Sequence, residues 1–150
     1  MYIRVTKEFT FEIAHALYGY DGPCKNIHGH SYQLSVTLKG KPVNDNLSPK
    51  NGMVVDFSII KNIVTAEIIE PCDHALILNN KTSKTLTSSL ENQKLIQVDF
   101  QPTCENLIIY FVSKLQNSLP AETILHHLLL KETSTSYAEW YFEDNEKKLI

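Results

Sequence analysis

The sequence has little of what proteins need to bind nucleic acid, to span a membrane or to build a disulfide framework. Its 150 residues include 14 basic and 17 acidic side chains, so no broad cationic surface is available for nucleic acid or anionic lipid. No apolar run approaches the roughly 18 residues of a membrane span, and the first residues lack the basic-then-apolar pattern of a signal peptide. We therefore expect a cytoplasmic protein that binds neither nucleic acid nor membranes.

Cysteine is also scarce. Three cysteines cannot all pair within one chain, and their spacing does not resemble the disulfide pattern of a small secreted domain, so we expect reduced thiols. The length allows one compact domain with a hydrophobic core but not two. The six histidines remain as the unusual feature of the composition.

Hydrophobic periodicity predicts an α+β domain. Strands are expected over residues 2–14, 30–38, 123–133 and 137–143, and helices over about 58–70, closed by Pro71, and from Pro102 and Thr103 to Pro120. The order of strand, strand, helix, helix, strand, strand is typical of an antiparallel sheet with helices on one face. Residues 79–91 are predicted to form an exposed excursion, and alternation from Ile96 to Phe100 indicates one further short strand.

Three histidines fall in phase on the first two predicted strands. His28 and His30 are two residues apart, so an extended backbone projects both imidazoles from one face. His15 continues the apolar parity of the first strand and points to the same interior if the two strands pair. Three neutral imidazoles without a fourth Cys or carboxylate are the make-up of an open Zn²⁺ site. Each histidine alone fits a chance motif or a core position, but their shared phase favours the metal.

The three thiols differ in their surroundings. Cys24 lies in a Gly- and Pro-containing loop four residues before His28. Thiols close to a cation or an imidazole lose their proton more readily, which makes Cys24 a candidate base or nucleophile, although an inert loop thiol fits the spacing equally well. Cys104, at the start of the second helix, is expected to pack in the core, and Cys72 is ambiguous because it adjoins Asp73 and His74.

Asp73 and His74 form the next candidate pair. Because the side chains of adjacent residues diverge, we do not expect the two to bond each other as a conventional pair. They could still serve one thiol, with His74 moving the proton and Asp73 fixing the tautomer of the ring. A polar loop that ends a helix explains the pair equally well.

Glu132 is the most informative carboxylate. Even-numbered positions from Ile124 to Leu130 are mostly apolar, so Glu132 is expected to point to the apolar face, where an unpaired charge would be costly. The adjacent N–H donors of a pterin or guanine edge would satisfy it in bidentate form, as would an internal lysine, a backbone group or exposure at the strand end. Thr103 and Glu105 at a helix N-terminus could complete such a pocket, or serve as ordinary caps.

These residues fall in six ordered blocks that resemble the 6-pyruvoyl-tetrahydropterin synthase family. The blocks are residues 11–15, 24–32, 52–57, 72–76, 102–107 and 131–133. They span nearly the whole chain in family order, so the similarity does not depend on the short His-Gly-His motif alone. The resemblance implies a tunnelling fold, in which four-stranded sheets of ββααββ order from three subunits join in a 12-stranded barrel. Two such trimers usually stack, so the expected partner is a second copy of this chain, in a trimer or a dimer of trimers.

The resemblance also implies a role for each candidate residue. His15, His28 and His30 would bind Zn²⁺, and Cys24 would be the proton acceptor, with Asp73 and His74 completing its relay. Glu132 would act in catalysis and anchor the pterin ring, helped by Thr103 and Glu105. The substrate of the family is 7,8-dihydroneopterin triphosphate, a small pterin triphosphate.

Two branches of the family differ in product. Three residues separate Cys24 from His28, which resembles the bacterial branch that makes 6-carboxy-5,6,7,8-tetrahydropterin with release of acetaldehyde and triphosphate, for queuosine synthesis. The alternatives are a 6-pyruvoyl-tetrahydropterin synthase that makes the biopterin precursor, and a non-catalytic pterin- or purine-binding protein with structural zinc. Retention of Cys24 argues against the variant that substitutes glutamate and serves folate synthesis.

Some features depart from the family pattern. The single domain over 1–150 carries a longer segment at about 80–100, which is expected to be an insertion that caps the pocket or makes another contact. Arg4 is the only arginine, so the triphosphate would have to meet lysines such as Lys25, backbone N–H groups or a neighbouring subunit. His126 and His127 have no expected task.

Overall fold

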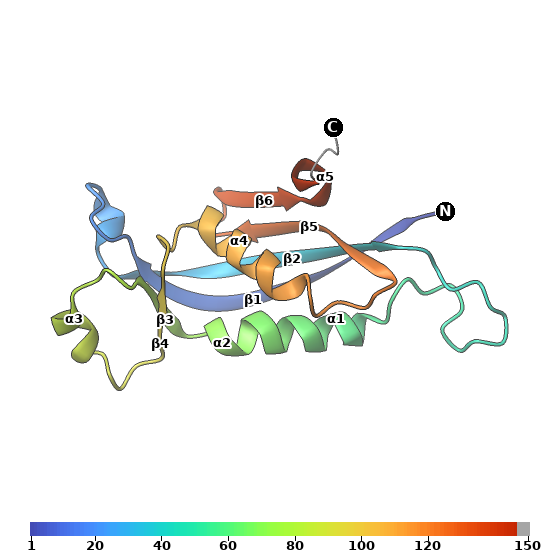
Figure 1. Ribbon diagram of the computed structural model, residues 1–150, viewed down its shortest axis with the longest axis horizontal. Helices are drawn as coiled ribbons and strands as arrows, with labels where there is room; N and C mark the ends of the chain where they lie inside the picture. The colour runs from blue at the N-terminus through green and yellow to red at the C-terminus, as the bar shows by residue number, and fades with distance from the viewer. Residues whose placement is uncertain (147–150) are drawn as a thin grey trace.

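The computed structural model describes residues 1–146, without the side chains of Lys84 and Thr85, and its centre is one six-stranded sheet (Figure 1). The strands lie in the order β4-β3-β1-β2-β5-β6. Their bounds are β1 (Ile3–Ala16), β2 (His28–Gly40), β3 (Ala75–Asn79), β4 (Leu95–Val98), β5 (Thr123–Lys131) and β6 (Tyr137–Tyr141). The pairs β1–β2, β2–β5 and β5–β6 are antiparallel, whereas β3 joins β1 and β4 joins β3 in parallel.

One face of this sheet is covered by helices and the other is left open. Helix α1 (Phe57–Val64), the π-helical turn η2 (Thr65–Ile69) and α2 (Glu70–Cys72) follow one another without a break, while α4 (Cys104–Leu115) packs on β5 and β6 (Figure 1). The short helices are η1 (Pro23–Lys25), α3 (Lys84–Ser88) and α5 (Phe142–Asn145). Alternation in β1 buries Phe11 and Ile13 under the helices and leaves Thr10 and Glu12 on the open face.

The first helix extends past the proline that was expected to close it. Pro71 lies inside α2, and the helix ends only where Asp73 takes an extended backbone conformation. The wider π turn just before Pro71, in which Glu70 N–H donates to Thr65 O, changes the hydrogen-bond register ahead of a residue that has no N–H of its own. The second helix begins as predicted, because the Thr103 side chain caps the Asn106 N–H.

The sheet has two strands more than the predicted four. Leu95–Val98 is the extra strand that alternation indicates, but the sequence pattern does not predict β3. All five residues of Ala75–Asn79 are buried, so the segment shows no alternation between core and solvent. The α+β class and the four antiparallel strands are confirmed, with β3 and β4 added at one edge.

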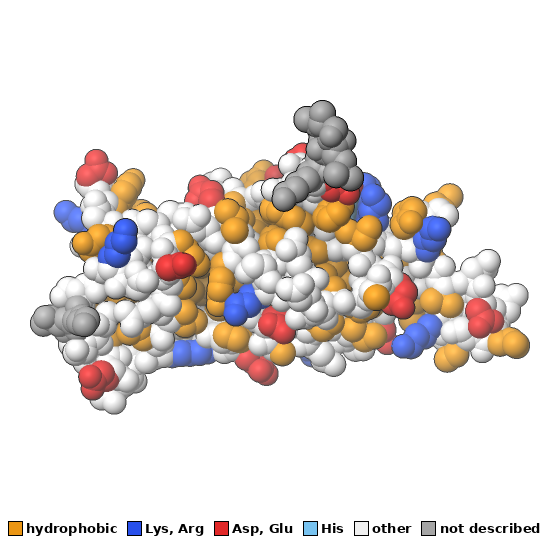
Figure 2. All heavy atoms as spheres, in the orientation of Figure 1, with side chains coloured by type: hydrophobic (Ala, Val, Ile, Leu, Met, Phe, Trp, Pro, Cys, Tyr) orange, Lys and Arg blue, Asp and Glu red, His pale blue; other side chains and the backbone are white. Residues whose placement is uncertain are grey.

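The surface agrees with the charge balance of the sequence. In Figure 2 lysine, arginine, aspartate and glutamate side chains are interspersed over the visible face, and no broad cationic patch forms there. Among the described residues, no helix is both long and apolar enough to cross a membrane.

Candidate metal centre and active site

Three histidines meet at one end of the β1–β2 hairpin. His15 lies opposite His28 in the strand register, and His30 lies opposite Ile13, so all three point to the helix-covered face. Each offers one ring nitrogen, and these nitrogens lie within 4.8 Å of one another. His15 is buried while His28 and His30 are partly exposed, so the cluster faces solvent on one side. The convergence expected from the sequence is therefore present, in a group that could hold a metal ion.

The backbone fixes which nitrogen two of these rings present. His15 Nδ1 lies 2.6 Å from the Pro102 carbonyl oxygen, and His28 Nδ1 lies 2.7 Å from the Asn26 carbonyl oxygen. Because a carbonyl can only accept, each Nδ1 carries the hydrogen, and each neutral ring then has a lone pair on Nε2. The two Nε2 atoms face each other at 3.1 Å. Neither can donate to the other, so a cation bound by both would satisfy them.

The chemistry and spacing of this donor set fit a metal ion. Tetrahedral zinc with Zn–N bonds of about 2.0–2.1 Å places its ligand nitrogens roughly 3.3 Å apart, close to the separation of the two facing Nε2 atoms. Burial lowers the pKa of His15 below its ordinary value, although the Pro102 carbonyl acts in the opposite sense. A neutral imidazole is the form that binds a metal, so burial keeps His15 ready for this role.

The carboxylate of Glu132 lies beside the cluster. Its Oε1 atom is 3.6 Å from His15 Nε2 and 4.0 Å from His30 Nε2. The same atom accepts a hydrogen bond of 2.9 Å from the Tyr32 hydroxyl. The Glu132 side chain is 24% exposed, so it is open to a ligand that approaches the histidines from solvent.

The side chains of β5 do not keep one alternation of buried and exposed positions along the whole strand. Leu128 and Leu130 are buried and in phase with Glu132, but Ile124 is exposed. A bulge interrupts the β2–β5 register, where His126 is the unpaired residue, and one extra residue moves every side chain before it to the opposite face.

Tyr32 is a site residue that the sequence reasoning missed. Its ring is fully buried behind the histidines, and burial together with the Glu132 carboxylate raises the pKa of its phenol above the ordinary value, so the hydroxyl remains a donor. A signal was available, because Tyr32 continues the two-residue period of His28 and His30 along β2.

The side chains of Asp73 and His74 approach each other, contrary to expectation. His74 Nδ1 lies 3.0 Å from Asp73 Oδ2. His74 has a φ of 59°, and this left-handed backbone turns its ring back toward the preceding residue. The Glu12 backbone anchors the pair, since its N–H donates to Asp73 Oδ1 at 2.9 Å and its carbonyl accepts from His74 N–H at 2.7 Å. The Glu12 N–H also holds the pKa of Asp73 below its ordinary value.

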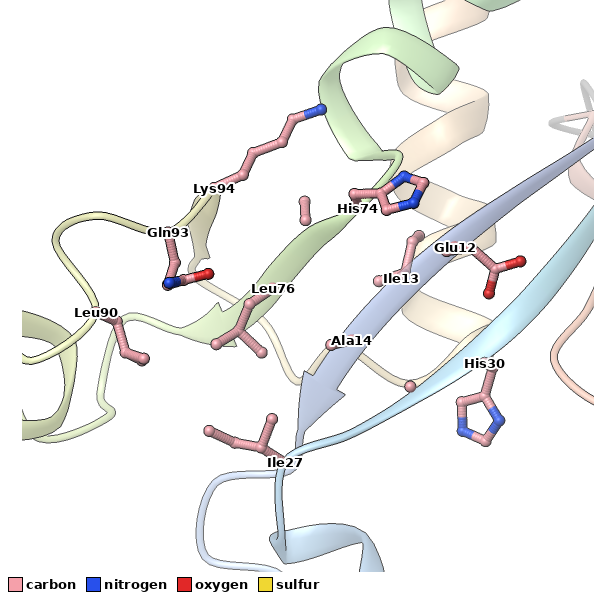
Figure 3. Close-up of a pocket in the computed structure, with 12 residues that line it drawn as sticks. Glu12, Ile13, Ala14, Ile27, His30, His74, Leu76, Leu90, Gln93 and Lys94 are labelled. Carbon is pink, nitrogen blue, oxygen red and sulfur yellow. The ribbon is translucent and has the colours of Figure 1, made fainter.

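The Asp73–His74 pair and the histidine cluster each contribute one residue, His74 and His30, to the lining of the same cavity. A cavity of about 400 Å³ runs along β1 and β3 from His74 to Leu90. Figure 3 shows the His74 ring near Glu12, and the His30 ring, from β2, on the other side of the β1 ribbon; both residues line the cavity. His74 is 76% exposed, so its ring is available to a group from outside.

The thiols have separate surroundings. Cys24 lies in η1, partly exposed, and its carbonyl accepts from Leu17 N–H at 2.9 Å. Within residues 1–146, no hydrogen bond or ion pair joins its thiol to the three histidines or to Asp73 and His74. Cys72 and Cys104 are buried, and burial raises the pKa of each thiol to about 11. Cys104 therefore packs as expected, and Cys72 is a core residue.

Thr103 and Glu105 lie at the N-terminus of α4, next to the Pro102 carbonyl that binds His15. The Thr103 oxygen accepts from Asn106 N–H at 3.3 Å, which is ordinary capping. Glu105 is exposed in the first turn, where its charge suits the helix dipole.

Comparison with known proteins adds to this geometry. A model of the family described as 6-pyruvoyl tetrahydropterin synthase matches residues 4–143. The chain is 35% identical over 141 residues to the 6-carboxy-5,6,7,8-tetrahydropterin synthase of Haemophilus influenzae, covering 91% of this chain and 97% of that protein. It is 26% identical over 145 residues to the 6-pyruvoyl tetrahydrobiopterin synthase of Pongo abelii, covering 89% of this chain and 87% of that protein.

A solved structure shares the fold. The 6-pyruvoyl tetrahydropterin synthase of Caenorhabditis elegans superposes with a TM-score of 0.68 at 23% identity, covering 94% of this chain and 96% of that chain. The fold, the family match over residues 4–143 and the similarity to named pterin synthases agree with one another. The chain belongs to the 6-pyruvoyl tetrahydropterin synthase family and is a pterin synthase of the lyase type.

Proposed function

We propose that this chain is a zinc-dependent synthase that converts 7,8-dihydroneopterin triphosphate and water to 6-carboxy-5,6,7,8-tetrahydropterin, with release of acetaldehyde and triphosphate. The product would supply the synthesis of the deazapurine precursor of queuosine. The observation that carries the proposal is the pair of Nε2 lone pairs on His15 and His28, 3.1 Å apart and next to the carboxylate of Glu132.

Zinc suits this donor set because three neutral imidazoles leave a position for substrate. His15, His28 and His30 would hold the ion, with the Pro102 and Asn26 carbonyls fixing two of the rings. Bound there, zinc would polarise the side-chain oxygens of the substrate and acidify the neighbouring C–H. The Glu132 carboxylate would accept hydrogen bonds from the N–H groups of the pterin ring and so orient the ring, with Thr103 and Glu105 nearby.

Proton transfer is assigned to Cys24, Asp73 and His74. Asp73 Oδ2 faces His74 Nδ1, which leaves His74 Nε2 free to exchange a proton with a thiol. Cys24 would accept the proton from the substrate carbon and pass it to this relay. Since no contact joins Cys24 to the relay within the described chain, we assign the relay of one subunit to the thiol of another.

The free edges of the sheet support such an assembly. Strand β3 pairs with β1 only over Ile13–Ala16, so Ile3 to Glu12 carry no strand on that side within the described residues. At the other end of the sheet, β6 is an edge strand with the exposed side chains of Tyr137 and Tyr141. Long open edges are normally covered or paired, and we propose that β6 of one copy joins β1 of the next in a trimer or a dimer of trimers.

Two observations favour the carboxy product. Three residues separate Cys24 from His28, as in the bacterial carboxy-forming branch that the sequence resembles. The relative that makes the carboxy product by name is 35% identical, against 26% for the relative named for the pyruvoyl product.

The experiment that tests the proposal is product analysis. Purified zinc-loaded protein is incubated with 7,8-dihydroneopterin triphosphate, and the products are identified by mass spectrometry, with Cys24→Ala as the inactive control. The carboxy compound and acetaldehyde are expected. The pyruvoyl compound would assign the chain to the biopterin branch. Tight binding without product, abolished by Glu132→Ala, would instead indicate a non-catalytic pterin-binding protein with structural zinc.

A further inference from the structure

The ring of Tyr32 is fully buried beneath the rings of His15 and His30. Its side chain has 0% exposure, and its ring stacks on Phe11 with 6.1 Å between centroids. The rings of His15 and His30 meet it edge-on, with centroids at 6.4 and 5.8 Å. Phe11 is also its partner in the strand register, and a different rotamer of Tyr32 would have to displace these packed rings.

That hydroxyl holds one particular oxygen of Glu132. It donates to Oε1 at 2.9 Å, and Oε1 is also the atom that lies 3.6 Å from His15 Nε2. His15 cannot share in holding it, because its hydrogen is on Nδ1 and its Nε2 has a lone pair. Among the described residues no hydrogen bond reaches Glu132 Oε2. The Tyr32 hydroxyl is therefore the side-chain donor that fixes the position of the Glu132 carboxylate.

Glu132 Oε1 lies close enough to the candidate metal site to compete with substrate for the open coordination position. Carboxylate oxygens are good zinc ligands, and a fourth protein ligand turns an open site into a closed structural one. Oε1 is within 4.0 Å of two of the three candidate ligand nitrogens, so a small movement would bring it into the position that substrate needs.

We propose that Tyr32 is a positioning residue that restrains Glu132 Oε1, so that Glu132 remains a free carboxylate beside the metal instead of its fourth ligand. The restraint leaves the open position to substrate and leaves Glu132 Oε2 free to receive N–H donors of the pterin. The inference rests on the proposed function, since it requires that His15, His28 and His30 bind a metal ion.

The variant Tyr32→Phe tests this by removing the hydroxyl and keeping the ring. Metal-free protein is titrated with Co²⁺, whose visible absorption reports its coordination, and the affinity is measured against a competing chelator. Without the hydroxyl, Glu132 is free to coordinate, so we expect Co²⁺ to bind tighter by about tenfold or more, with a changed spectrum. Activity should fall although the metal is bound more tightly, which a merely structural role would not produce.

The matched control is the same change on a Glu132→Gln background. Removing the carboxylate alters metal affinity through its charge alone, so the comparison is Tyr32→Phe/Glu132→Gln against Glu132→Gln, where we expect no tightening and no spectral change. A tightening that persists on this background would overturn the inference, as would an unchanged affinity and spectrum in Tyr32→Phe.

Metal binding by Glu132→Gln and by the wild type gives two further tests. Should Tyr32→Phe fail to fold, the Co²⁺ spectrum of Glu132→Gln decides alone: a spectrum like that of the wild type supports a free carboxylate, and a changed one overturns it. If the wild-type protein bound neither Zn²⁺ nor Co²⁺, both the proposed function and the role of Tyr32 would be wrong. If the wild type binds metal and Tyr32→Phe has the same Co²⁺ affinity and spectrum, only the role of Tyr32 is overturned.

Discussion

The Nε2 atoms of His15 and His28 face each other at 3.1 Å, and each ring is bound through its Nδ1 to a backbone carbonyl. Two lone pairs at this separation repel each other, so this end of the hairpin is electrostatically unfavourable without a cation. The acceptors that hold the rings, Pro102 and Asn26, lie outside the cluster. The metal-free protein should therefore hold its ligands in place and gain stability when the ion binds.

Zinc is expected to stabilise the fold and to bind once per chain. At a free Zn²⁺ concentration of 100 times Kd, binding to the folded state alone adds about 2.7 kcal/mol to the free energy of unfolding. Thermal unfolding with and without chelator measures this shift, and elemental analysis measures the stoichiometry. His28→Ala should lose both effects, whereas His127→Ala, on β5 and outside the cluster, should keep them. A wild type that unfolds at the same temperature with zinc and with chelator would contradict the prediction.

Cys24→Ala is expected to lower kcat by about 10²–10⁴-fold, the range for loss of a positioned proton-transfer group. The thiol is partly exposed in η1 and is not part of the histidine cluster, so the melting temperature and zinc content should stay those of the wild type. Steady-state kinetics with circular dichroism and metal analysis check both parts. Cys24→Ser, with a less acidic group of the same shape, should also be slow. Wild-type turnover by Cys24→Ala would remove Cys24 from the proposed chemistry.

Mixing two inactive variants tests whether the relay serves the thiol of another subunit. Cys24→Ala and His74→Ala should each be inactive, because each lacks one half of the proton path. If the two halves come from different subunits, random exchange restores roughly a quarter of the sites. Unfolding and refolding the variants together, followed by an activity assay, measures this. Mass spectrometry of the intact assemblies shows whether subunits have exchanged, and exchanged assemblies without activity would place both groups in one subunit.

The parts of the site that follow strand periodicity could be predicted from the sequence. His28 and His30 are two residues apart on one strand, and His15 is in phase on its neighbour, so extended backbone and simple pairing bring the three together. The N-terminus of α4 was predictable for a similar reason, because Thr103 caps the helix with its own side chain.

The remaining features depend on tertiary structure. The contact of Tyr32 with Glu132 joins residues 100 positions apart, and the carbonyl of Pro102 that holds His15 has no signature in a side-chain pattern. The close approach of Asp73 and His74 occurs where His74 has a left-handed backbone, which is uncommon for a residue other than glycine. The bulge at His126 reverses the faces of β5 without a local sequence signal of its own.

His126, the residue at this bulge, lies between Arg4 and Glu143, and its side-chain hydrogen bond is to Arg4. Its Nε2 accepts a hydrogen bond from Arg4 Nε on β1, so its hydrogen is on Nδ1, which lies 3.2 Å from Glu143 Oε1. Only 5% of the residue is exposed. Burial holds the pKa of His126 below its ordinary value of 6.5, and Arg4, Lys39 and His127 add to this effect while Glu143 opposes it.

The lowered pKa of His126 gives the stability a definite pH dependence. Above pH 6.5 the ring is neutral in both folded and unfolded chains, and it contributes no slope. As the pH falls below 6.5, His126 becomes protonated in the unfolded chain but stays neutral in the folded chain. Protonated His126 Nε2 would face the Arg4 N–H donor in the folded chain. The free energy of unfolding therefore decreases with falling pH, by at most about 1.4 kcal/mol per pH unit for this one proton.

The variant His126→Gln isolates this contribution, since an amide oxygen can accept from Arg4 Nε and does not titrate. Urea unfolding between pH 7.5 and 5.5, in the presence of chelator, should show a smaller loss of stability for His126→Gln than for the wild type. If His126→Gln and the wild type lost the same stability over this range, folding would not lower the pKa of His126, and the residue would have no role in the acid sensitivity.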